Sequence, residues 1–142
     1  MNASDIRLID SESGLRQAWP VMRQLRNHLD EETFVTQALR QMRSGWLLAG
    51  NFHDERPVAL AGYRYVENLH AGFHMHVDDL VSDEGHRGSG AAKALFEWLV
   101  NEARRNGCKQ LHLDSGVQRH RAHRFYLDRG MIISSHHFQL VL

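Results

Sequence analysis

The residues with the clearest chemical potential lie past the middle of the chain, where a strand pattern, a glycine-rich turn and a helix pattern follow one another directly. The turn spans residues 85–90 and contains Gly85, Gly88 and Gly90. Glycine lets the backbone come close to a ligand and adopt φ angles that other residues resist. The first turn of the following helix adds unpaired N–H groups and the positive end of the helix dipole. This combination predicts a cradle for a phosphate or pyrophosphate group.

Two common nucleotide-binding patterns do not account for this turn. A mononucleotide P-loop needs Gly-Lys-Ser or Gly-Lys-Thr at its end, and neither occurs in the sequence. The dinucleotide fingerprint G-x-G-x-x-G would require glycine where Lys93 stands, and it belongs to an early βαβ unit. Both patterns are therefore excluded.

The segment Arg87–Ala92 instead resembles the signature [RQ]-x-x-G-x-[GA] of the GNAT superfamily of N-acetyltransferases. In that family the backbone amides of this segment hold the pyrophosphate of coenzyme A. The position also agrees with the family, because the segment follows the fourth predicted strand and opens the longest predicted helix.

A second motif of the family, N-x-x-A-x-x-x-Y followed by a Gly-aromatic step, is matched in part further along the chain. Ala122, Tyr126 and Gly130 stand at the expected spacing, whereas Arg119 replaces the asparagine and Met131 replaces the aromatic residue. The resemblance covers residues 46–142. It implies one GNAT domain over residues 1–142, with a mixed, mostly antiparallel sheet of six or seven strands flanked by about four helices.

The resemblance implies an acetyl-CoA-dependent transfer of an acetyl group directly to a primary amine, with no metal required. Such a reaction needs a donor for the developing oxyanion, a base for the amine proton and an acid for the departing thiolate. By position in the family, the cofactor-binding residues are expected to be Leu80, Val81, Ser82, Arg87, Gly88, Ser89, Gly90, Ala91, Ala92 and Arg119.

Two residues are expected to carry the proton transfers. Tyr126 matches the general acid of the family, and a phenol with a pKa near ~10 is protonated at neutral pH. Asp79 stands where many members have an acidic residue on the fourth strand, which makes it the candidate base; Asp78 and Glu84 are the alternatives nearby. The competing interpretation is structural: a tyrosine packed in the core, and an acidic strand end hydrogen-bonded to backbone amides.

The stretch Val117–Leu127 has a closer resemblance to the aminoalkylphosphonate N-acetyltransferases, including arginine at position 119. This favours the amine of a small molecule over that of a protein as the acceptor. Acetylation of a protein amine, and a GNAT-like module that binds acetyl-CoA without catalysis, remain the alternatives.

Composition narrows the possible partners. The 17 Lys and Arg residues balance the 17 Asp and Glu residues, so the overall field typical of nucleic-acid binders is missing. No apolar run reaches the ~20 residues that a membrane helix needs, and we expect no membrane partner. One cysteine, Cys108, fits a reducing compartment and a cytoplasmic location. The GNAT resemblance adds the expectation of a homodimer.

The eleven histidines and the cysteine suggest two further hypotheses. The histidine pairs, which are His74 with His76, His120 with His123, and His136 with His137, offer ligands for Zn²⁺ or Ni²⁺. Scattered pairs without a defined spacing are more often polar surface, so no metal ligand is assigned. Cys108 follows a helix end with no base in view, which indicates an inert thiol rather than a nucleophile.

The elements that must position these residues are predicted from periodicity. The expected strands are Ile6–Ile9, Trp46–Ala49, Val58–Tyr65, Phe73–Val81, Gln110–Asp114 and one or two more within Met131–Leu142. A first helix follows the spacing of Leu15 to Leu29, capped by Ser11 or Ser13 and bent at Pro20. The others are expected from Glu31 with Asp30 as its cap, over Ala92–Ala103, and over Ala122–Arg129 up to Gly130.

Overall fold

The computed structural model describes residues 4–142, and its elements follow the predicted order. The strands are β1 (Asp5–Leu8), β2 (Leu47–His53), β3 (Arg56–Asn68), β4 (Gly72–Ser82) and β5 (Leu111–Leu113). The helices are α1 (Glu12–Met22), α2 (Glu31–Arg43), α3 (Ala91–Arg105) and α4 (His120–Asp128), with a 3-10 turn, η1 (Glu84–His86), between β4 and α3. No helix within this range is long and apolar enough to cross a bilayer.

The described chain falls into two compact units, the first ending at His112 and the second beginning at Leu113. The first unit holds α1, α2, α3 and the strands β1–β4; the second holds α4 and the C-terminal segment. Each unit is described separately below. The organisation of residues 1–142 as one domain stays a prediction.

The sheet runs in the order β1-β2-β3-β4-β5, and its first three strand pairs are antiparallel. Helix α3 connects β4 to β5, which is the crossover that parallel neighbours need. The β3–β4 pairing has one irregularity: Gly62 lies opposite Asp79, whereas Tyr63 lies opposite Val77. Asp78 is therefore an extra residue on β4, a bulge that bends the strand and redirects the side chains that follow.

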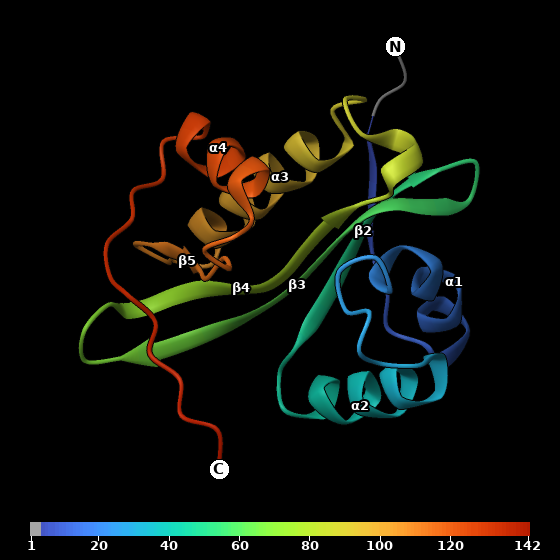
Figure 1. Ribbon diagram of the computed structural model, residues 1–142, viewed down its shortest axis with the longest axis horizontal. Helices are drawn as coiled ribbons and strands as arrows, with labels where there is room; N and C mark the ends of the chain where they lie inside the picture. The colour runs from blue at the N-terminus through green and yellow to red at the C-terminus, as the bar shows by residue number, and fades with distance from the viewer. Residues whose placement is uncertain (1–3) are drawn as a thin grey trace. The chain divides into compact units, whose positions relative to one another are not determined.

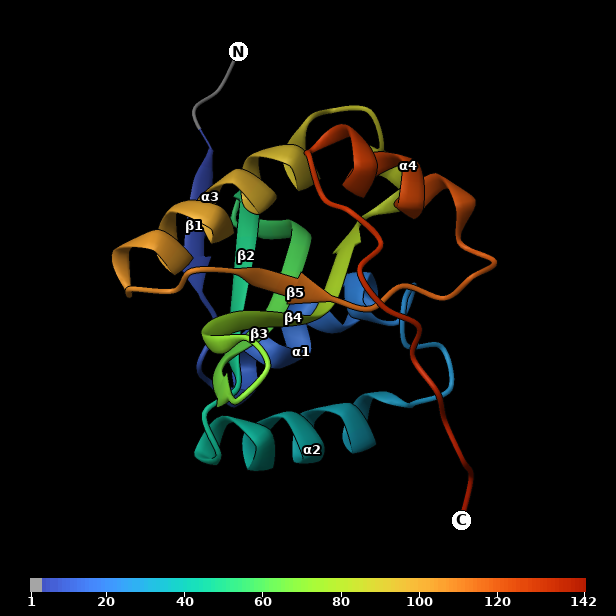
Figure 2. The same ribbon diagram turned by 90° about the vertical axis from the view of Figure 1, so that its left-hand side faces the viewer.

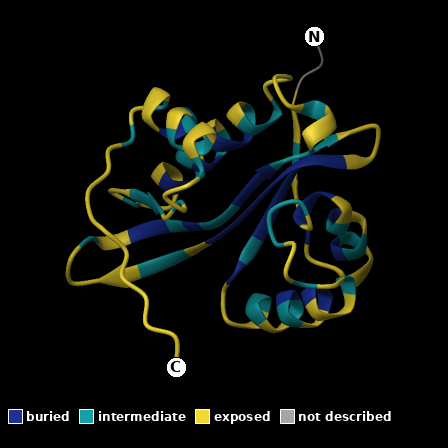
Figure 3. Ribbon diagram, in the orientation of Figure 1, coloured by how far each residue is buried: buried dark blue, intermediate teal, exposed yellow. Residues whose placement is uncertain are grey.

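Helices α1 and α2 cover one face of the sheet and α3 covers the other (Figures 1 and 2). The central parts of β2 and β3 and stretches of β4 are buried between them, as the dark blue ribbon in Figure 3 shows. The main core lies under α1 and α2 and is built from residues such as Leu15, Met22, Phe34, Leu48 and Leu60. On the opposite face α3 buries its apolar stripe, which consists of Leu95, Phe96, Leu99 and Ala103.

Both predicted helix caps are present. The Ser11 hydroxyl accepts a hydrogen bond from the Gly14 amide at 3.1 Å, and the Asp30 carboxylate accepts one from the Thr33 amide at 2.7 Å. Pro20 lies inside α1, as predicted, but the helix ends at Met22 and does not extend to Leu29. Residues 23–30 form a separate connecting segment between α1 and α2, and four of its side chains, those of Gln24, Arg26, His28 and Leu29, reach the candidate site.

The prediction of six or seven strands is wrong: within residues 4–142 the sheet has five, because residues 131–142 form no strand. The apolar side chains that suggested strands there are all exposed, namely Ile132, Ile133, Phe138, Leu140 and Val141. Strand propensity measures how well a residue fits beside a paired neighbour, and it does not supply that neighbour. Along this segment the described residues contribute no partner strand.

Candidate active site

The glycine-rich turn has the backbone that an anion cradle requires. Gly88 and Gly90 adopt φ angles of 83° and 86°, in the left-handed region that favours glycine. Gly90 is the N-cap residue of α3 and offers no side chain to the first-turn amides, while its carbonyl accepts the first helical bond, from the Ala94 amide at 2.9 Å. A Cβ atom at either glycine would meet nothing in the described protein within 4 Å. The turn therefore has amides and open space for a phosphate group, so it fits coenzyme A.

Both ends of this turn are anchored by side chains from other elements. Gln24, in the segment between α1 and α2, donates to the Asp83 carboxylate at 2.9 Å and accepts from the Glu84 amide at 2.9 Å. At the other end the buried Asn51 of β2 donates to the carbonyl of Ala91 at 3.1 Å. Because the cradle is made of backbone, these two side chains fix its position.

Strand β4 presents its acidic pair in two different environments. Asp78, the bulge residue, forms a double hydrogen bond with the half-exposed Arg64, at 2.8 and 3.1 Å. Asp79 turns to the α1–α2 side and is largely buried, with its side chain 12% exposed. The bulge thus separates a surface ion pair from a carboxylate directed into the protein.

The three residues after Asp79 continue the ladder with β3. Leu80, Val81 and Ser82 lie opposite Ala61, Leu60 and Ala59. In an antiparallel ladder, alternate residues direct their backbone N–H groups to opposite edges of the strand. This stretch therefore directs backbone groups away from β3 as well as toward it, as a strand that binds an extended ligand requires.

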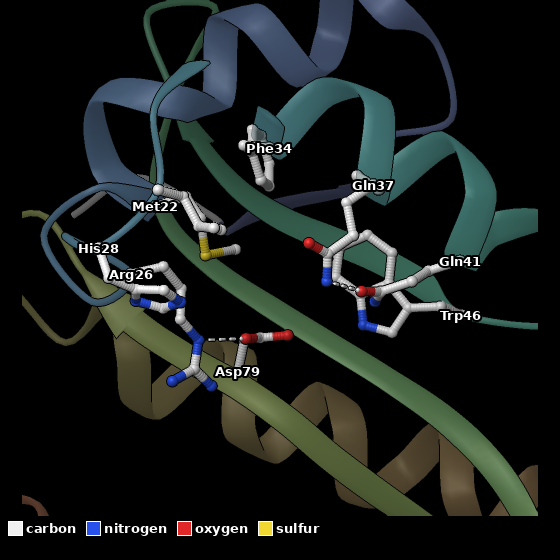
Figure 4. A pocket seen from close by; sticks show the side chains of 10 residues that line it. Met22, Arg26, His28, Phe34, Gln37, Gln41, Trp46 and Asp79 are labelled. Atoms are coloured by element: carbon white, nitrogen blue, oxygen red, sulfur yellow. Dashed lines mark hydrogen bonds and ion pairs between the residues drawn. The ribbon is translucent and has the colours of Figure 1, made fainter. Parts of the chain in front are cut away.

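Asp79 lies at one end of a cavity of about 200 Å³ between β4, α2 and the connecting segment (Figure 4). The apolar part of its wall comes from Met22, Leu29, Phe34, Ala38 and the Trp46 ring. Its polar lining consists of Arg26, His28, Gln37, Gln41 and Asp79. The cavity is thus a small apolar pocket with a few convergent polar groups, which is the usual form of a small-molecule site.

Two donors flank the Asp79 carboxylate. Arg26 Nε donates to Asp79 Oδ1 at 2.8 Å, and Arg26 Nη2 donates to the backbone carbonyl of Asp78 at 2.8 Å. The Trp46 indole Nε1 is buried, has no hydrogen-bond partner among the described residues, and points toward Asp79 in Figure 4. Its proximity lowers the pKa of Asp79 although the geometry falls short of a hydrogen bond. Burial is the larger effect, and it raises the pKa of Asp79 above its usual value in spite of Arg26.

In the second unit, Tyr126 is the buried residue of α4. Burial raises the pKa of its phenol, and the positive charge of Arg119 opposes that rise. The hydroxyl thus stays protonated at neutral pH, as a proton donor to a thiolate must. Arg119, predicted to contact the cofactor, is the N-cap residue of α4 and lies beside Tyr126.

The other candidate residues have less specific surroundings. Arg87 and Ser89 are exposed in the turn, and Glu84 is exposed in η1. Cys108 is partly buried, which raises the pKa of its thiol and disfavours a nucleophilic thiolate. His74 is buried, with its ring centroid 4.6 Å from that of His112. The described residues contain no group of three or more His, Cys, Asp or Glu side chains arranged to hold a metal ion.

Sequence reasoning missed four residues that build this site, namely Gln24, Arg26, Trp46 and Asn51. None belongs to a local motif, because each acts across a long separation in sequence. The predicted strand Trp46–Ala49 includes Trp46, whereas the structure begins β2 at Leu47. Asn51 lies beyond the predicted strand Trp46–Ala49, and the structure places it inside β2 as a buried polar residue, which requires a hydrogen-bond partner.

Comparison with known proteins agrees with this geometry. Residues 13–131 match the Acetyltransferase (GNAT) family. YhdJ of Bacillus subtilis (strain 168), described as an uncharacterized N-acetyltransferase, is 32% identical over 94% of this chain and 96% of its own. The aminoalkylphosphonate N-acetyltransferase of Salmonella typhimurium is 30% identical over 75% of this chain and 70% of its own.

A solved structure gives the same fold at low identity. The aminoglycoside N-acetyltransferase AAC(6′)-Iy, solved in complex with CoA, aligns with a TM-score of 0.85 and 12% identity over 99% of this chain and 97% of its own. The chain belongs to the GNAT family and is an N-acetyltransferase. The resemblance drawn from the two sequence motifs is thereby confirmed.

Proposed function

We propose that this enzyme transfers the acetyl group of acetyl-CoA directly to the primary amine of a small molecule bound in the cavity beside Asp79. The observation that carries the proposal is the cavity itself, which ends on a buried carboxylate and measures about 200 Å³. Pockets for drug-sized ligands usually span roughly 300–1,000 Å³. A compact amine therefore suits the cavity better than a protein segment does.

The proton transfers are assigned to Asp79 and Tyr126. The amine nitrogen forms a bond with the thioester carbon while Asp79, directly or through a water molecule, accepts the proton that the nitrogen loses. The bond between carbon and sulfur breaks, and the Tyr126 hydroxyl donates its proton to the departing thiolate. The raised pKa of each residue supports its role, since it makes the carboxylate a better base and keeps the phenol protonated.

Acetyl-CoA is assigned to the turn and to the strand before it. The amides of residues 87–92, at the start of α3, are proposed to hold the pyrophosphate, with Arg87 and Arg119 adding positive charge. Residues Leu80–Ser82 are proposed to bind the pantetheine arm through their backbone. The open space over Gly88 and Gly90 supports this assignment.

The Salmonella relative, by its name, acetylates aminoalkylphosphonates. Aminoalkylphosphonates are accordingly the first acceptors to test, followed by amino acids, simple alkylamines and an aminoglycoside. Peptides with a free N-terminus or a lysine serve as protein-like acceptors. Release of the CoA thiol during turnover reports acetyl transfer to any member of the panel.

Two substitutions test the catalytic assignment with the best acceptor found. Asp79→Asn and Tyr126→Phe should each lower kcat by about 100-fold or more, the usual contribution of a general base or acid. Acetyl-CoA affinity, measured by calorimetry, should change little. Full turnover in Asp79→Asn would remove the proposed base. Turnover restricted to peptides would replace the small-molecule acceptor with a protein amine.

The exposed apolar residues of the segment 131–142 support a homodimer. Six of its side chains, Ile132, Ile133, Phe138, Leu140, Val141 and Leu142, are at least 75% exposed. Large apolar side chains exposed in such number usually mark an interaction site. Light scattering should give the mass of two 16.4 kDa chains. Replacing Phe138 and Leu140 by Ser should give monomers, and a monomeric parent protein would contradict the proposal.

A further inference from the structure

The Asp79 carboxylate is bound by an arginine from a distant part of the chain, in addition to being buried. Its Oδ1 atom pairs with Arg26, a residue 53 positions away in sequence, on the segment between α1 and α2. The same guanidinium also donates a hydrogen bond to the backbone carbonyl of Asp78, so Arg26 binds β4 at two consecutive residues. Two hydrogen bonds from one planar group fix the orientation of arginine, which a point charge such as lysine does not achieve.

The backbone opposite Asp79 is shaped around this carboxylate. Gly62 is its partner across the ladder, and a Cβ at that position would lie 2.8 Å from Cε2 of Trp46 and closer still to Asp79 Oδ2 and Trp46 Cζ2. The carboxylate and the indole thus occupy the space that any other residue at 62 would fill. Asp79 has little freedom to move away from Arg26, so the pair is a fixed part of the cavity.

The surroundings leave Arg26 as the cation that balances Asp79. From the connecting segment the cavity receives Arg26 and His28, and from β4 it receives Asp79, with Asp78 next to it in sequence. Helix α2 contributes the neutral amides of Gln37 and Gln41, which bond each other at 2.8 Å. Helix α1, β3 and the residue just before β2 contribute uncharged groups at this point, which are Met22, Gly62 and Trp46.

We propose that Arg26 is a positioning residue for acetyl transfer: it fixes the Asp79 carboxylate at the end of the cavity and keeps it in the form that accepts a proton. The proposal rests on the assignment of Asp79 as the base. A carboxylate surrounded by apolar groups favours its protonated form, and an opposite charge at hydrogen-bond distance reverses that preference. Burial and Arg26 act on the pKa of Asp79 in these opposite directions.

Arg26 also lines the cavity, and the two hydrogen bonds leave one of its guanidinium nitrogens available. Nε and Nη2 are engaged by Asp79 and Asp78, and within the described residues Nη1 has no hydrogen-bond partner. The residue is more exposed than the acid it holds, with a side chain 38% exposed against 12%. Arg26 thus bonds the proposed base and also lines the cavity in which the acceptor is proposed to bind.

The test is the pH dependence of kcat in Arg26→Gln, with Arg23→Gln as the matched control. Arg23 belongs to the same segment and is exposed, whereas Arg26 is the residue that bonds Asp79. Because the ionised form of Asp79 is the active one, a higher pKa moves the acidic limb of the profile to higher pH. Arg26→Gln should move this limb upward by about one pH unit or more, while Arg23→Gln leaves it in place.

Two further variants keep the interpretation unambiguous. Arg26→Lys retains the positive charge but cannot form both hydrogen bonds in the same geometry. The acidic limb of its pH profile should therefore stay near that of the parent enzyme, while kcat falls. His28→Ala removes the histidine of the cavity and should leave the limb unchanged. Binding of acetyl-CoA to every variant, measured by calorimetry, verifies that the protein is folded.

A double-mutant cycle separates this proposal from the proposed function. If Arg26 acts through Asp79, the loss of kcat caused by Arg26→Gln should disappear in an Asp79→Asn background. Full additivity, or an unshifted limb in folded Arg26→Gln, overturns the positioning role. Full activity of Asp79→Asn by itself overturns the assignment of the base, and therefore both proposals.

Discussion

Two glycines in this enzyme have opposite roles. Gly90, at the start of α3, lacks a side chain over open space, and its left-handed φ of 86° is what gives the turn its form. Gly62, in the middle of β3, lacks a side chain in a place already filled by Asp79 and Trp46. The missing side chain at Gly90 leaves room for a ligand. The missing side chain at Gly62 lets the Asp79 carboxylate and the Trp46 ring pack against the backbone of β3.

The difference extends to the regions around these glycines. The turn is exposed and offers backbone amides, anchored from outside by Gln24 and Asn51. The cavity is formed by side chains, with a buried carboxylate between an arginine and an indole. Binding of acetyl-CoA and acceptance of a proton are thus expected to fail independently, and substitutions in the two regions should affect different kinetic constants.

The largest effect is expected from Gly90→Glu, which breaks the turn. The side chain adds bulk and negative charge where a pyrophosphate is proposed to lie, and the left-handed φ adds strain of about 1–2 kcal/mol. Acetyl-CoA affinity measured by calorimetry should fall by about 100-fold or more, equivalent to ~2.7 kcal/mol.

The matched control is Gly107→Glu at the opposite end of α3. Its φ of 82° and its empty surroundings are nearly the same as those of Gly90. It should cost similar stability and leave acetyl-CoA affinity intact. Equal loss of affinity in both variants would show that strain in the helix, rather than the cradle, determines binding.

A smaller effect, on different constants, is expected from Gly62→Ala in the cavity. The added Cβ overlaps the Asp79 carboxylate and the Trp46 ring, and overpacking of a tight core costs about 1–3 kcal/mol. The urea midpoint and kcat should both fall, with acetyl-CoA affinity unchanged. Gly50→Ala in β2 is the control, since its Cβ would meet the flexible side chains of Ile9 and Phe52 at 3.0 Å. That variant should lose stability and keep its kcat; unchanged kcat in Gly62→Ala would contradict the close packing of Asp79.

The smallest effect is expected from Asn51→Ala, which loosens the turn without entering it. The change removes the hydrogen bond to the Ala91 carbonyl, a loss of about 1 kcal/mol. The KM for acetyl-CoA should rise a few-fold while kcat stays near that of the parent. Asn106→Ala removes a similar bond, to the Glu102 carbonyl at 2.8 Å, on the surface at the other end of α3. An equal rise in the KM of Asn106→Ala would show that the effect of Asn51→Ala does not come from loosening the turn.

The same contrast explains which parts of the site could be predicted from the sequence. The turn depends on glycines and a helix start that are adjacent in the chain, so residues 87–92 were found by local pattern. The partners of Asp79 come from positions 26, 46 and 62. Only the pairing of β3 with β4 and the path of the connecting segment bring them together, and periodicity contains no information on either.

For the fold as well, the features that depend on residues close together in sequence could be predicted, and those that depend on distant residues could not. The element order as far as α4 and the caps of α1 and α2 follow from short-range signals, and they are confirmed. The end of α1 at Met22 and the absence of strands in residues 131–142 depend on tertiary surroundings. The apolar character of Ile132 or Phe138 is the same whether or not a neighbouring strand is present to pair with.

The short segment 23–30 limits how this enzyme can diversify. Gln24 and Arg26 are two positions apart, and they secure the turn and the acid respectively. A change of length or path in this segment would disturb the turn and the Asp79 carboxylate together. The opposite wall of the cavity, where α2 supplies Phe34, Gln37 and Gln41, contacts neither the turn nor Asp79 through a hydrogen bond. If the cavity binds the acceptor as proposed, new acceptor preferences can therefore arise there by exchange of side chains along one helix, while the residues proposed to perform the chemistry stay in place.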